Sequence, residues 1–406
     1  MPHARHYGKI MSNPITNKCI LLVVDTTHGQ IGGTEQNTLR FAQSLLKRGY
    51  VPILIEVGLP LLANSVDSTG LQLIHIAAKG FSDVSWKTWR TLLDNLRPGV
   101  VVRSKTWVGC INSKLDAVMA ISKITYLSWE HHPSLPNRAF TLNNEQLHAF
   151  HPRNIKFQLK RAARLQLHMR SAKQTVAVSH AVREPLIEHY PVSATKVGII
   201  YPGVDFDFFQ HSPEARKQLR QQWNIPESAF VIGSLGRLAA HKGNDFTLEI
   251  MAKLLEKNSE LNIWCVIAGK GGDLTRLQEL AKKLNIAERV RFPGWQDDAP
   301  KAWSAIDVFL MPSSDEGLGM TLIEAAASGC IPIAAKVGGM QEILCGKLDK
   351  YLCRPNDIDA WIKVTSSLIS PCERSKQHPI IYQDLRKRFD AGTQWNFMVD
   401  WVECNS

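Results

Sequence analysis

An alternation between short apolar runs and helical segments, which starts near residue 19, is the feature that most constrains the fold of this chain. The run CILLVVD (residues 19–25) has the length of a buried strand, and a helical pattern at residues 34–49 follows it after a glycine-containing loop. VPILIEV (residues 51–57) supplies the next apolar run. Two strands joined by a helix form a β-α-β unit, which predicts parallel pairing of the strands.

The second half of the chain repeats this alternation. After an irregular segment at residues 201–209, strand-like and helix-like segments alternate to about residue 370. We therefore predict an α/β protein with two Rossmann-like domains, residues 1–200 and 201–385, that face each other across a central cleft. Residues 386–406 are expected to form a C-terminal helix that packs back on the first domain. Because α/β domains bind ligands at strand ends and at domain boundaries, we expect the ligand site in that cleft.

The composition excludes several classes of protein. The chain has 406 residues, 44% of them hydrophobic, which is enough for two cores. No run of about 18 apolar residues predicts a transmembrane helix, and the N-terminus lacks the apolar centre of a secretory signal. The eight cysteines are scattered without the spacing of metal ligands. We expect a cytoplasmic protein with reduced thiols.

The net charge of +11 comes from the first half of the chain. Residues 1–200 contain 24 lysines and arginines against 11 acids, whereas residues 201–406 contain 24 against 26. Residues 151–173 carry seven basic side chains and no acid, in a pattern with helical spacing. This segment is typical of a solvated helix face, or of a basic amphipathic helix that contacts anionic lipid headgroups or a pyrophosphate-bearing acceptor. The second interpretation would place the protein peripherally on the inner face of the cell membrane.

The most informative motif is EGLGMTLIEAAASG, residues 316–329, which sets two glutamates eight residues apart around a predicted helix start. Glu316 lies in a glycine-containing loop after an apolar strand, and Glu324 lies one turn into the helix. Free backbone N–H groups and the positive end of the helix dipole suit a phosphate, while the two carboxylates can accept hydrogen bonds from hydroxyl groups. A helix with a solvated acidic start is the alternative.

A second motif, GSLGRLAAHKG at residues 233–243, leaves the first predicted strand of the second domain. Arg237 and Lys242 lie five residues apart in this loop, near enough to reach one diphosphate; two unrelated surface cations are the alternative. Together with Glu316 and Glu324, they indicate a site for a nucleoside diphosphate. In the first domain, Gly33 precedes a helix start that would favour an anion, although a structural turn accounts for it equally well.

In this order, the motifs resemble those of the GT-B glycosyltransferases of the large retaining family 4. The resemblance covers nearly the whole chain, through the segments GGTEQNTLRFAQSLLKRG, VSHAVREPL, YPGVD, GRLAAHKG, VIAGKGGD, VRFPGW and EGLGMTLIEAAASGCIPIAAKVGGMQEIL. It implies transfer of a hexose or N-acetylhexosamine from a nucleotide sugar, expected to be UDP-linked, to a saccharide acceptor, expected to be lipid-linked. The implied pathway is cell-surface polysaccharide or lipopolysaccharide biosynthesis. No prosthetic group, metal ion or nucleic-acid partner is expected.

The resemblance also implies roles for individual residues. Glu324 would hold the donor ribose and Glu316 would face the transferred sugar, while Arg237 and Lys242 would stabilise the diphosphate leaving group. Further donor contacts are implied for Gly33, for the backbone of Leu318, Gly319, Met320 and Thr321, and for the loop around Phe292, which would border the base.

SWEHHP, residues 128–133, ends a predicted strand of the first domain. It resembles the family segment whose histidine lies near the reacting sugar, with His131 the expected residue and His132 its close competitor. Without the resemblance, two histidines at a strand end are more often structural or surface features.

Three departures from the family pattern bear on donor preference rather than on the reaction class. KLDKYLCRPND, residues 347–357, replaces the usual glycine-bearing turn after the last helix of the donor domain. Leu318 stands where an aromatic residue is common, and His241 stands where an acid is often found. Two other functions are left open: a GT-B sugar-nucleotide epimerase, which would need no acceptor, and a nucleotide-sugar-binding protein without catalysis.

Overall fold

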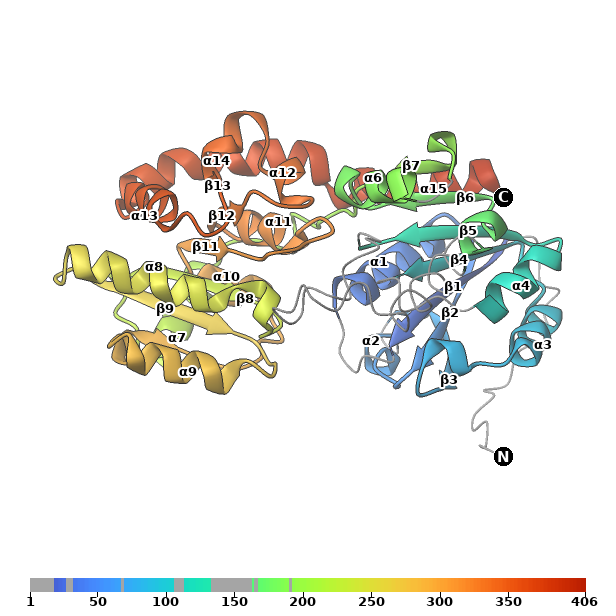
Figure 1. Cartoon of the computed structure of the whole chain (residues 1–406), viewed down its shortest axis with the longest axis horizontal. Helices are drawn as coiled ribbons and strands as arrows, with labels where there is room; N and C mark the ends of the chain where they lie inside the picture. Colours follow the sequence, from blue (N-terminus) through green and yellow to red (C-terminus); the bar gives the residue numbers. More distant parts are fainter. Residues whose placement is uncertain are drawn as a thin grey trace, which may run out of the picture. The chain divides into compact units, whose positions relative to one another are not determined.

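The computed structural model describes residues 18–26, 32–66, 69–105, 113–132, 163, 167–189 and 192–406. The chain divides into two compact units. Unit 1 comprises Met1–Pro202 together with Gln394–Ser406, and unit 2 comprises Gly203–Thr393. Each unit contains one sheet, and its strands and helices can be followed by their labels (Figure 1).

The sheet of unit 1 has seven strands in the order β3-β2-β1-β4-β5-β6-β7, and all of their described pairings are parallel. The chain moves outward from β1 to β3 and then continues on the other side of β1 with β4, which is the Rossmann order. The strands are β1 (Cys19–Thr26), β2 (Val51–Gly58), β3 (Gln72–Ala77), β4 (Val100–Lys105), β5 (Thr125–Glu130), β6 (Gln174–Ala177) and β7 (Val197–Ile199).

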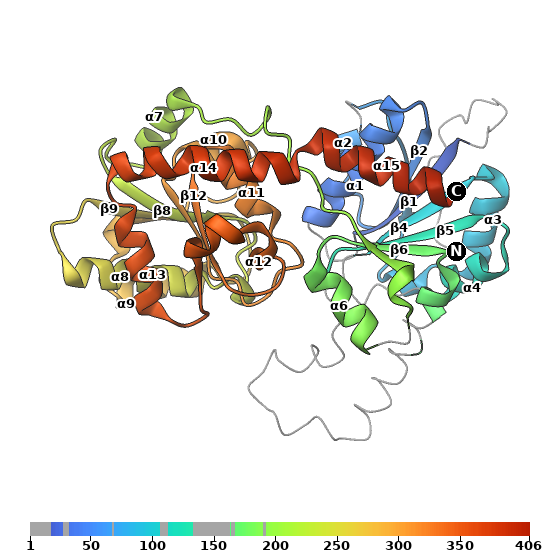
Figure 2. The same cartoon turned by 90° about the horizontal axis from the view of Figure 1, so that it is seen from above.

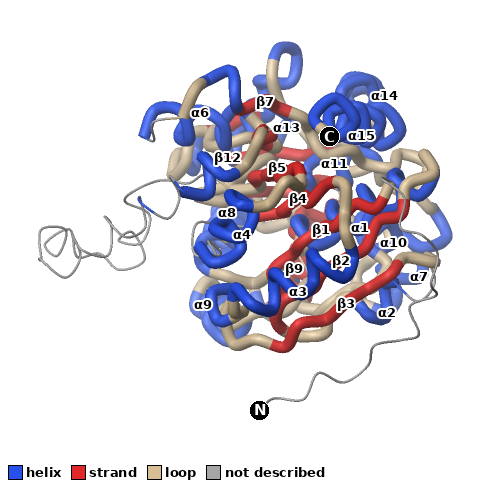
Figure 3. Tube along the Cα trace, turned by 90° about the vertical axis from the view of Figure 1, so that its right-hand side faces the viewer, coloured by secondary structure: helices blue, strands red, loops and turns tan. Residues whose placement is uncertain are grey.

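Helices cover both faces of the sheet of unit 1 (Figure 3). On one face, Trp89 and Leu93 of α3 and Leu115 of α4 pack in a core with Leu21 and Val23 of β1. On the other face, α1 packs against β1, β2 and β4. The helical segments are α1 (Gly33–Lys47), α2 (Ala63–Val66), η1 (Phe81–Asp83), α3 (Trp86–Leu96), α4 (Ser113–Ile121), α6 (His180–His189), η5 (Ala194–Lys196) and α15 (Ala391–Asn405).

Most of the C-terminal helix α15 belongs to unit 1, where it packs through an aromatic side chain. The Trp395 ring lies 6.4 Å from that of Phe41 and 6.0 Å from that of Trp129. The chain reaches α15 from α14 (Pro371–Phe389), and the two helices meet at Asp390, whose ψ of 132° is outside the helical region. The Asp390 N–H still donates to the carbonyl oxygen of Arg386 (3.1 Å), but the Ala391 N–H donates to that of Val204 (2.9 Å), so the helical hydrogen bonding is interrupted at residue 391.

The sheet of unit 2 has six parallel strands in the order β10-β9-β8-β11-β12-β13. Counted from β8, this is again the Rossmann order, in which the direction of strand addition reverses between β8 and β11. The strands are β8 (Phe230–Leu235), β9 (Ile263–Ala268), β10 (Val290–Arg291), β11 (Val308–Met311), β12 (Ile331–Ala335) and β13 (Leu352–Cys353).

Two sets of helices pack in unit 2 (Figure 2). In the first set, α8 contacts α9 and α13. In the second set, α7 contacts α10, α10 contacts α11, and α11 contacts α14. The helical segments not yet given are α7 (Pro213–Gln222), η6 (Ala240–Lys242), α8 (Asn244–Lys257), α9 (Leu274–Lys283), η7 (Ala287–Arg289), α10 (Ala299–Ser304), α11 (Met320–Ala327), α12 (Met340–Ile343), η8 (Gly346–Tyr351) and α13 (Ile358–Ser367).

Both sheets confirm the predicted pair of Rossmann-like folds. Every residue of β1 is buried, as expected of a parallel strand covered on both faces. The first three predicted elements differ from β1, α1 and β2 by no more than two residues at any end. No helix in the part of the chain that the structure describes combines the length and the apolar character needed to cross a membrane.

A buried ion cluster anchors the amino end of β11. The Asp307 carboxylate accepts hydrogen bonds from Arg216 (2.7 Å), from Arg220 (2.9 Å) and from the backbone N–H of Val231 in β8 (2.8 Å), and Arg374 lies 3.6 Å away. Burial alone would raise the pKa of Asp307, but the three guanidinium groups and the backbone N–H hold this pKa below its usual range. The cluster therefore joins α7, α14 and two neighbouring strands.

Replacing Asp307 by Asn should strongly destabilise the protein, because it leaves three guanidinium groups without their shared carboxylate. We expect the free energy of unfolding to fall by about 3 kcal/mol, measured by urea denaturation at pH 7. Asp207→Asn is the matched control, since the side chain of Asp207 is 75% exposed and pairs with Arg386 at the surface. Its effect should stay within about 1 kcal/mol.

The contribution of Asp307 to the stability of the fold should depend on pH. Because folding lowers the pKa of Asp307, its contribution is complete above the ordinary Asp pKa of about 3.9 and is lost as the pH falls through the lower, folded-state pKa. The stability difference between wild type and Asp307→Asn should therefore narrow below about pH 4. Equal stabilities at pH 7 would contradict this account of the cluster.

Candidate active site

The two motifs that were predicted to bind the donor follow neighbouring strands in the middle of the sheet of unit 2. Lys242 ends the short helix η6 after β8, and Glu316 lies in the loop between β11 and α11. Strands β8 and β11 pair with each other and flank the point where the strand order reverses. In open α/β sheets, ligands bind at the carboxyl ends of strands at this point. The tertiary structure thus brings the two motifs together where a ligand is expected.

Backbone contacts hold the two loops together. The Ser314 N–H donates to the carbonyl oxygen of His241 (2.9 Å), which ties the β11 loop to the β8 loop. Gly243 has a φ of +67°, and a Cβ at this position would lie 2.6 Å from the carbonyl oxygen of Pro312. A side chain at Gly243 would therefore separate the loops.

A third segment, residues 338–339, packs against the loop that contains Glu316. The Gly339 N–H donates to the carbonyl oxygen of Glu316 (3.3 Å). Gly338, with a φ of +51°, packs so closely that a Cβ there would collide with the same carbonyl oxygen. The carbonyl group of Glu316 thus packs closely against the Gly338–Gly339 segment.

The side chains of Lys242 and Glu316 form an ion pair between Nζ and Oε1. The Lys242 side chain is 29% exposed and that of Glu316 is 15% exposed, so the pair is reachable from solvent while partly desolvated. Spacing in the sequence does not reveal this pairing, because 74 residues separate the two side chains.

Helix α11 begins at Met320, as predicted, and Gly319 precedes it as an N-cap without a side chain. The first N–H groups of the helix therefore have no side-chain cap, and they form the positive end of the helix dipole. Met320 and Thr321 are half-buried, and Leu318 is 4% exposed, so its side chain belongs to the core. Glu324 is half-buried one turn along the helix.

Arg237 lies on the same loop as Lys242, and its side chain is exposed. Within the described residues, no ion pair joins Arg237 to another side chain. The loop around Phe292 lies near this region, since the Gly269 N–H after β9 donates to the carbonyl oxygen of Gly294 (2.8 Å). Phe292 is half-buried and the neighbouring Trp295 is 48% exposed.

Gly33 opens α1 in unit 1. It is exposed, and a Cβ there would meet no described atom within 4 Å. The start of this helix carries its own carboxylate, because Glu35, which is fully buried, accepts a hydrogen bond from the Gly32 N–H (2.6 Å). The N–H of Gly32, the N-cap residue, is therefore paired within the protein, and the donor contact expected at Gly33 stays a prediction.

His131 follows β5 and is 9% exposed. Its Nε2 lies 3.0 Å from the hydroxyl of Ser104 at the end of β4, and its ring centroid lies 4.3 Å from that of Trp129. Burial lowers the pKa of His131 to about 3, against an opposing effect of the Glu130 charge, so the ring is neutral at pH 7. His132, the competing residue, is half-buried.

A buried polar network lies beside His131. The Glu130 carboxylate binds Lys105 (2.8 Å) and accepts a hydrogen bond from Ser128 (2.8 Å), and it lies 3.3 Å from His168. Burial would raise the pKa of Glu130, but Lys105 and His168 hold it well below its usual range. This network locks the end of β5 against β4 and so fixes the backbone that carries His131.

The chain contains Asp-x-Asp sequences at Asp205/Asp207 and at Asp357/Asp359, a pattern that holds metal ions in some proteins, and the first aspartate of each has a structural role here. Asp205 accepts hydrogen bonds from the N–H groups of Asp207 and Phe208, and Asp357 caps α13 by accepting from the Ala360 N–H. Among the described residues, no group of three or more His, Cys, Asp or Glu side chains is arranged to hold a metal ion.

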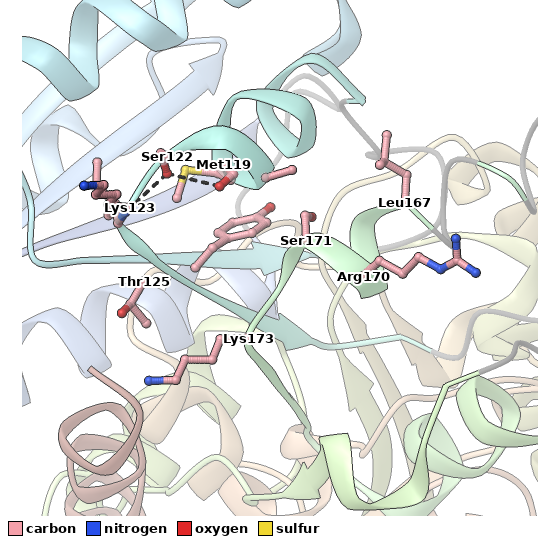
Figure 4. Close-up of a pocket in the computed structure, with 11 residues that line it drawn as sticks. Met119, Ser122, Lys123, Thr125, Leu167, Arg170, Ser171 and Lys173 are labelled. Carbon is pink, nitrogen blue, oxygen red and sulfur yellow. Dashed lines mark hydrogen bonds between the residues drawn. The ribbon is translucent and has the colours of Figure 1, made fainter.

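A pocket of about 400 Å³ lies at the opposite edge of the sheet of unit 1, where β5 begins (Figure 4). Lys123, Arg170 and Lys173 line it, together with the ring of Tyr126. It is therefore distinct from the strand end that carries His131. Most of the basic segment predicted at residues 151–173 lies outside the described residues.

The sequence alone did not predict the contacts that hold the candidate residues in place. The Asp307 cluster, Ser104 beside His131, and Gly338 and Gly339 behind Glu316 were not predicted. Of these, VGG after a short apolar run was visible as a turn signal, but its contact with Glu316 depends on tertiary packing.

Two family profiles match the chain. One, described as Glycosyltransferase Family 4, matches residues 31–208, and the other, described as Glycosyl transferases group 1, matches residues 215–381. Among curated proteins, a D-inositol 3-phosphate glycosyltransferase of Corynebacterium urealyticum is 33% identical over 191 residues. This match covers 45% of the chain and 45% of the relative, so the similarity spans about half the length of each.

Solved structures resemble the chain over nearly its whole length. HepE of Anabaena, in complex with UDP and glucose, has a TM-score of 0.76 at 18% identity, covering 95% of this chain and 100% of that protein. WaaG, a glycosyltransferase involved in lipopolysaccharide biosynthesis, has a TM-score of 0.70 at 17% identity, covering 94% and 99%. At these identities the likeness concerns the fold, which is GT-B.

The two profiles together account for both Rossmann-like units, and they agree with the solved structures on the fold. The chain therefore belongs to glycosyltransferase family 4, the group 1 glycosyl transferases with the GT-B fold.

Proposed function

We propose that the protein is a retaining glycosyltransferase that moves a hexose or N-acetylhexosamine from a UDP-sugar to a lipid-linked saccharide acceptor. Unit 2 would bind the donor and unit 1 the acceptor. The observation that carries the proposal is the meeting of Lys242, Glu316 and the uncapped start of α11 at the carboxyl ends of β8 and β11.

The donor half of this proposal follows from charge. A leaving diphosphate gains negative charge as the bond to the sugar breaks, and cations together with a helix N-terminus stabilise that charge. Lys242 and the exposed Arg237 would supply the cations, and the N–H groups of Met320 and Thr321 the helix start. Glu324 would accept hydrogen bonds from the ribose.

The transfer step needs no nucleophile from the protein in this proposal. The bond between the anomeric carbon and the diphosphate oxygen breaks, and the acceptor hydroxyl attacks on the face that the leaving group vacates. A neutral His131 would accept or donate a hydrogen bond at a sugar hydroxyl without adding charge to the site.

Relatives support the choice of substrates. HepE has been solved with UDP and glucose, WaaG acts in lipopolysaccharide biosynthesis, and the curated relative transfers a sugar in D-inositol 3-phosphate chemistry. We therefore place this protein in cell-surface polysaccharide or lipopolysaccharide synthesis, at the cytoplasmic face of the membrane. The basic first half of the chain and the cations around the pocket of unit 1 favour an acceptor in an anionic surface.

Lys242→Ala and Glu324→Ala should each lower kcat, since the first removes a cation at the leaving group and the second a ribose contact. We expect a loss of about 100-fold or more for Lys242→Ala, comparable to deletion of one transition-state donor. The assay measures UDP release from common UDP-sugars given membrane extract. Lys253→Ala, an exposed lysine of α8, is the matched control.

This assay, together with product analysis without acceptor and a measurement of UDP-sugar binding, separates the candidate functions. Full activity in both variants would contradict the mechanism. Conversion of the donor to an epimer without acceptor would favour the epimerase. Tight UDP-sugar binding without turnover would favour a binding protein.

His131→Ala should lower kcat by at least about tenfold through loss of a positioning contact, whereas His132→Ala should have a smaller effect. Because the ring of His131 becomes charged only near pH 3, its protonation should cause no inflection in kcat between pH 5 and pH 8. The pH profile of UDP release tests this, and the His132 variant serves as the control. A larger loss in His132→Ala would reverse the assignment.

The protein should bind liposomes that contain anionic phospholipid, and added salt should weaken that binding because exposed charges are screened. The double variant Lys123→Gln/Arg170→Gln should bind at least about tenfold more weakly, since each cation near an anionic surface contributes about 1 kcal/mol. Sedimentation with vesicles measures both effects, with Lys253→Gln as the control. Absence of binding at low salt would favour a soluble acceptor.

A further inference from the structure

The proposed function assigns Lys242 and Glu316 to different parts of the donor, the diphosphate and the sugar. The structure joins the two side chains to each other. A donor diphosphate and the Glu316 carboxylate therefore compete for the same ammonium group. Lys242 carries a single positive charge, so an anion that binds it weakens the compensation of the Glu316 charge in a partly desolvated position, unless the ligand also donates hydrogen bonds to the carboxylate.

We propose that Glu316 is a specificity residue that makes binding of the diphosphate depend on the presence of the sugar. The diphosphate takes Lys242 from Glu316, and the released carboxylate then accepts hydrogen bonds from hydroxyl groups of the sugar. A whole UDP-sugar satisfies both side chains, whereas UDP satisfies only the lysine. This inference rests on the proposed function and adds to it a reason why the spent nucleotide leaves.

The partial burial of Lys242 and Glu316 determines how strongly loss of their ion pair should affect ligand binding. At 15% exposure, the Glu316 side chain has lost much of its hydration, so an unpaired charge there is more costly than at a free surface. Lys242, at 29% exposure, is open enough for a ligand to reach its amine. An ion pair of fully exposed side chains would show little coupling, as such pairs contribute almost nothing.

The backbone contacts confine the exchange to the side chains. The bond from Ser314 to His241 and the bond from Gly339 to Glu316 do not involve either charged group. Lys242 and Glu316 can therefore change partners while their loops stay in place. For the same reason, Glu316→Gln should leave the fold intact, which makes it a suitable test variant.

Isothermal titration with UDP measures the competition in four proteins: wild type, Glu316→Gln, Lys242→Gln and the double variant. We expect Glu316→Gln to bind UDP about fivefold more tightly than wild type, because Lys242 is no longer held by a carboxylate. In the Lys242→Gln background, the same change should have no effect. Titration with UDP-glucose should show weaker binding by Glu316→Gln than by wild type. The preference of the protein for UDP-glucose over UDP should therefore fall in this variant.

Glu256→Gln is the matched control, since Glu256 pairs with Lys253 on α8 at 2.6 Å with both side chains more than half exposed. This substitution should change neither the affinity for UDP nor the affinity for UDP-glucose. Weaker UDP binding by Glu316→Gln, or the same change with and without Lys242, would overturn the inference while leaving the proposed function standing. A wild-type protein that binds no UDP would overturn the proposed function and this inference together.

Discussion

The parallel pairing of β8 with β11 is the interaction on which the candidate donor site depends. These strands are separated by more than 70 residues, yet they lie side by side because the Rossmann order reverses between them. The loops that follow β8 and β11 therefore begin next to each other. Lys242 lies in the loop after β8 and Glu316 in the loop after β11, where their side chains form an ion pair.

Strand β11 is only four residues long, and it is held at both ends. At its amino end, Asp307 binds the arginines of α7 and α14 and the backbone of β8. At its carboxyl end, the loop of Glu316 is tied to His241 and to Gly339. The candidate active-site side chains thus lie at one end of β11, and the buried charges of the Asp307 cluster hold the other end.

Much of the architecture and several candidate residues could be predicted from the sequence. Apolar runs such as CILLVVD report burial on both faces of a strand, and the helical patterns between them leave parallel pairing as the consistent arrangement. The start of α11 at Met320 was predictable, because a glycine precedes an apolar helical pattern there. In contrast, the hydrogen bond between Glu35 and the Gly32 N–H at the start of α1 was not predicted, since spacing does not show which way a carboxylate turns.

What the sequence by itself determined is the succession of strands and helices, the family to which the chain belongs, and the residue types that a nucleotide-sugar site requires. These are local properties, because hydrophobic periodicity and turn residues act over a few neighbours. Only the tertiary structure decided that Lys242 binds Glu316, that Ser104 lies against His131, and that three arginines share Asp307. Those contacts join residues from separate elements, and their geometry is set by packing of backbone against backbone, which no linear spacing records.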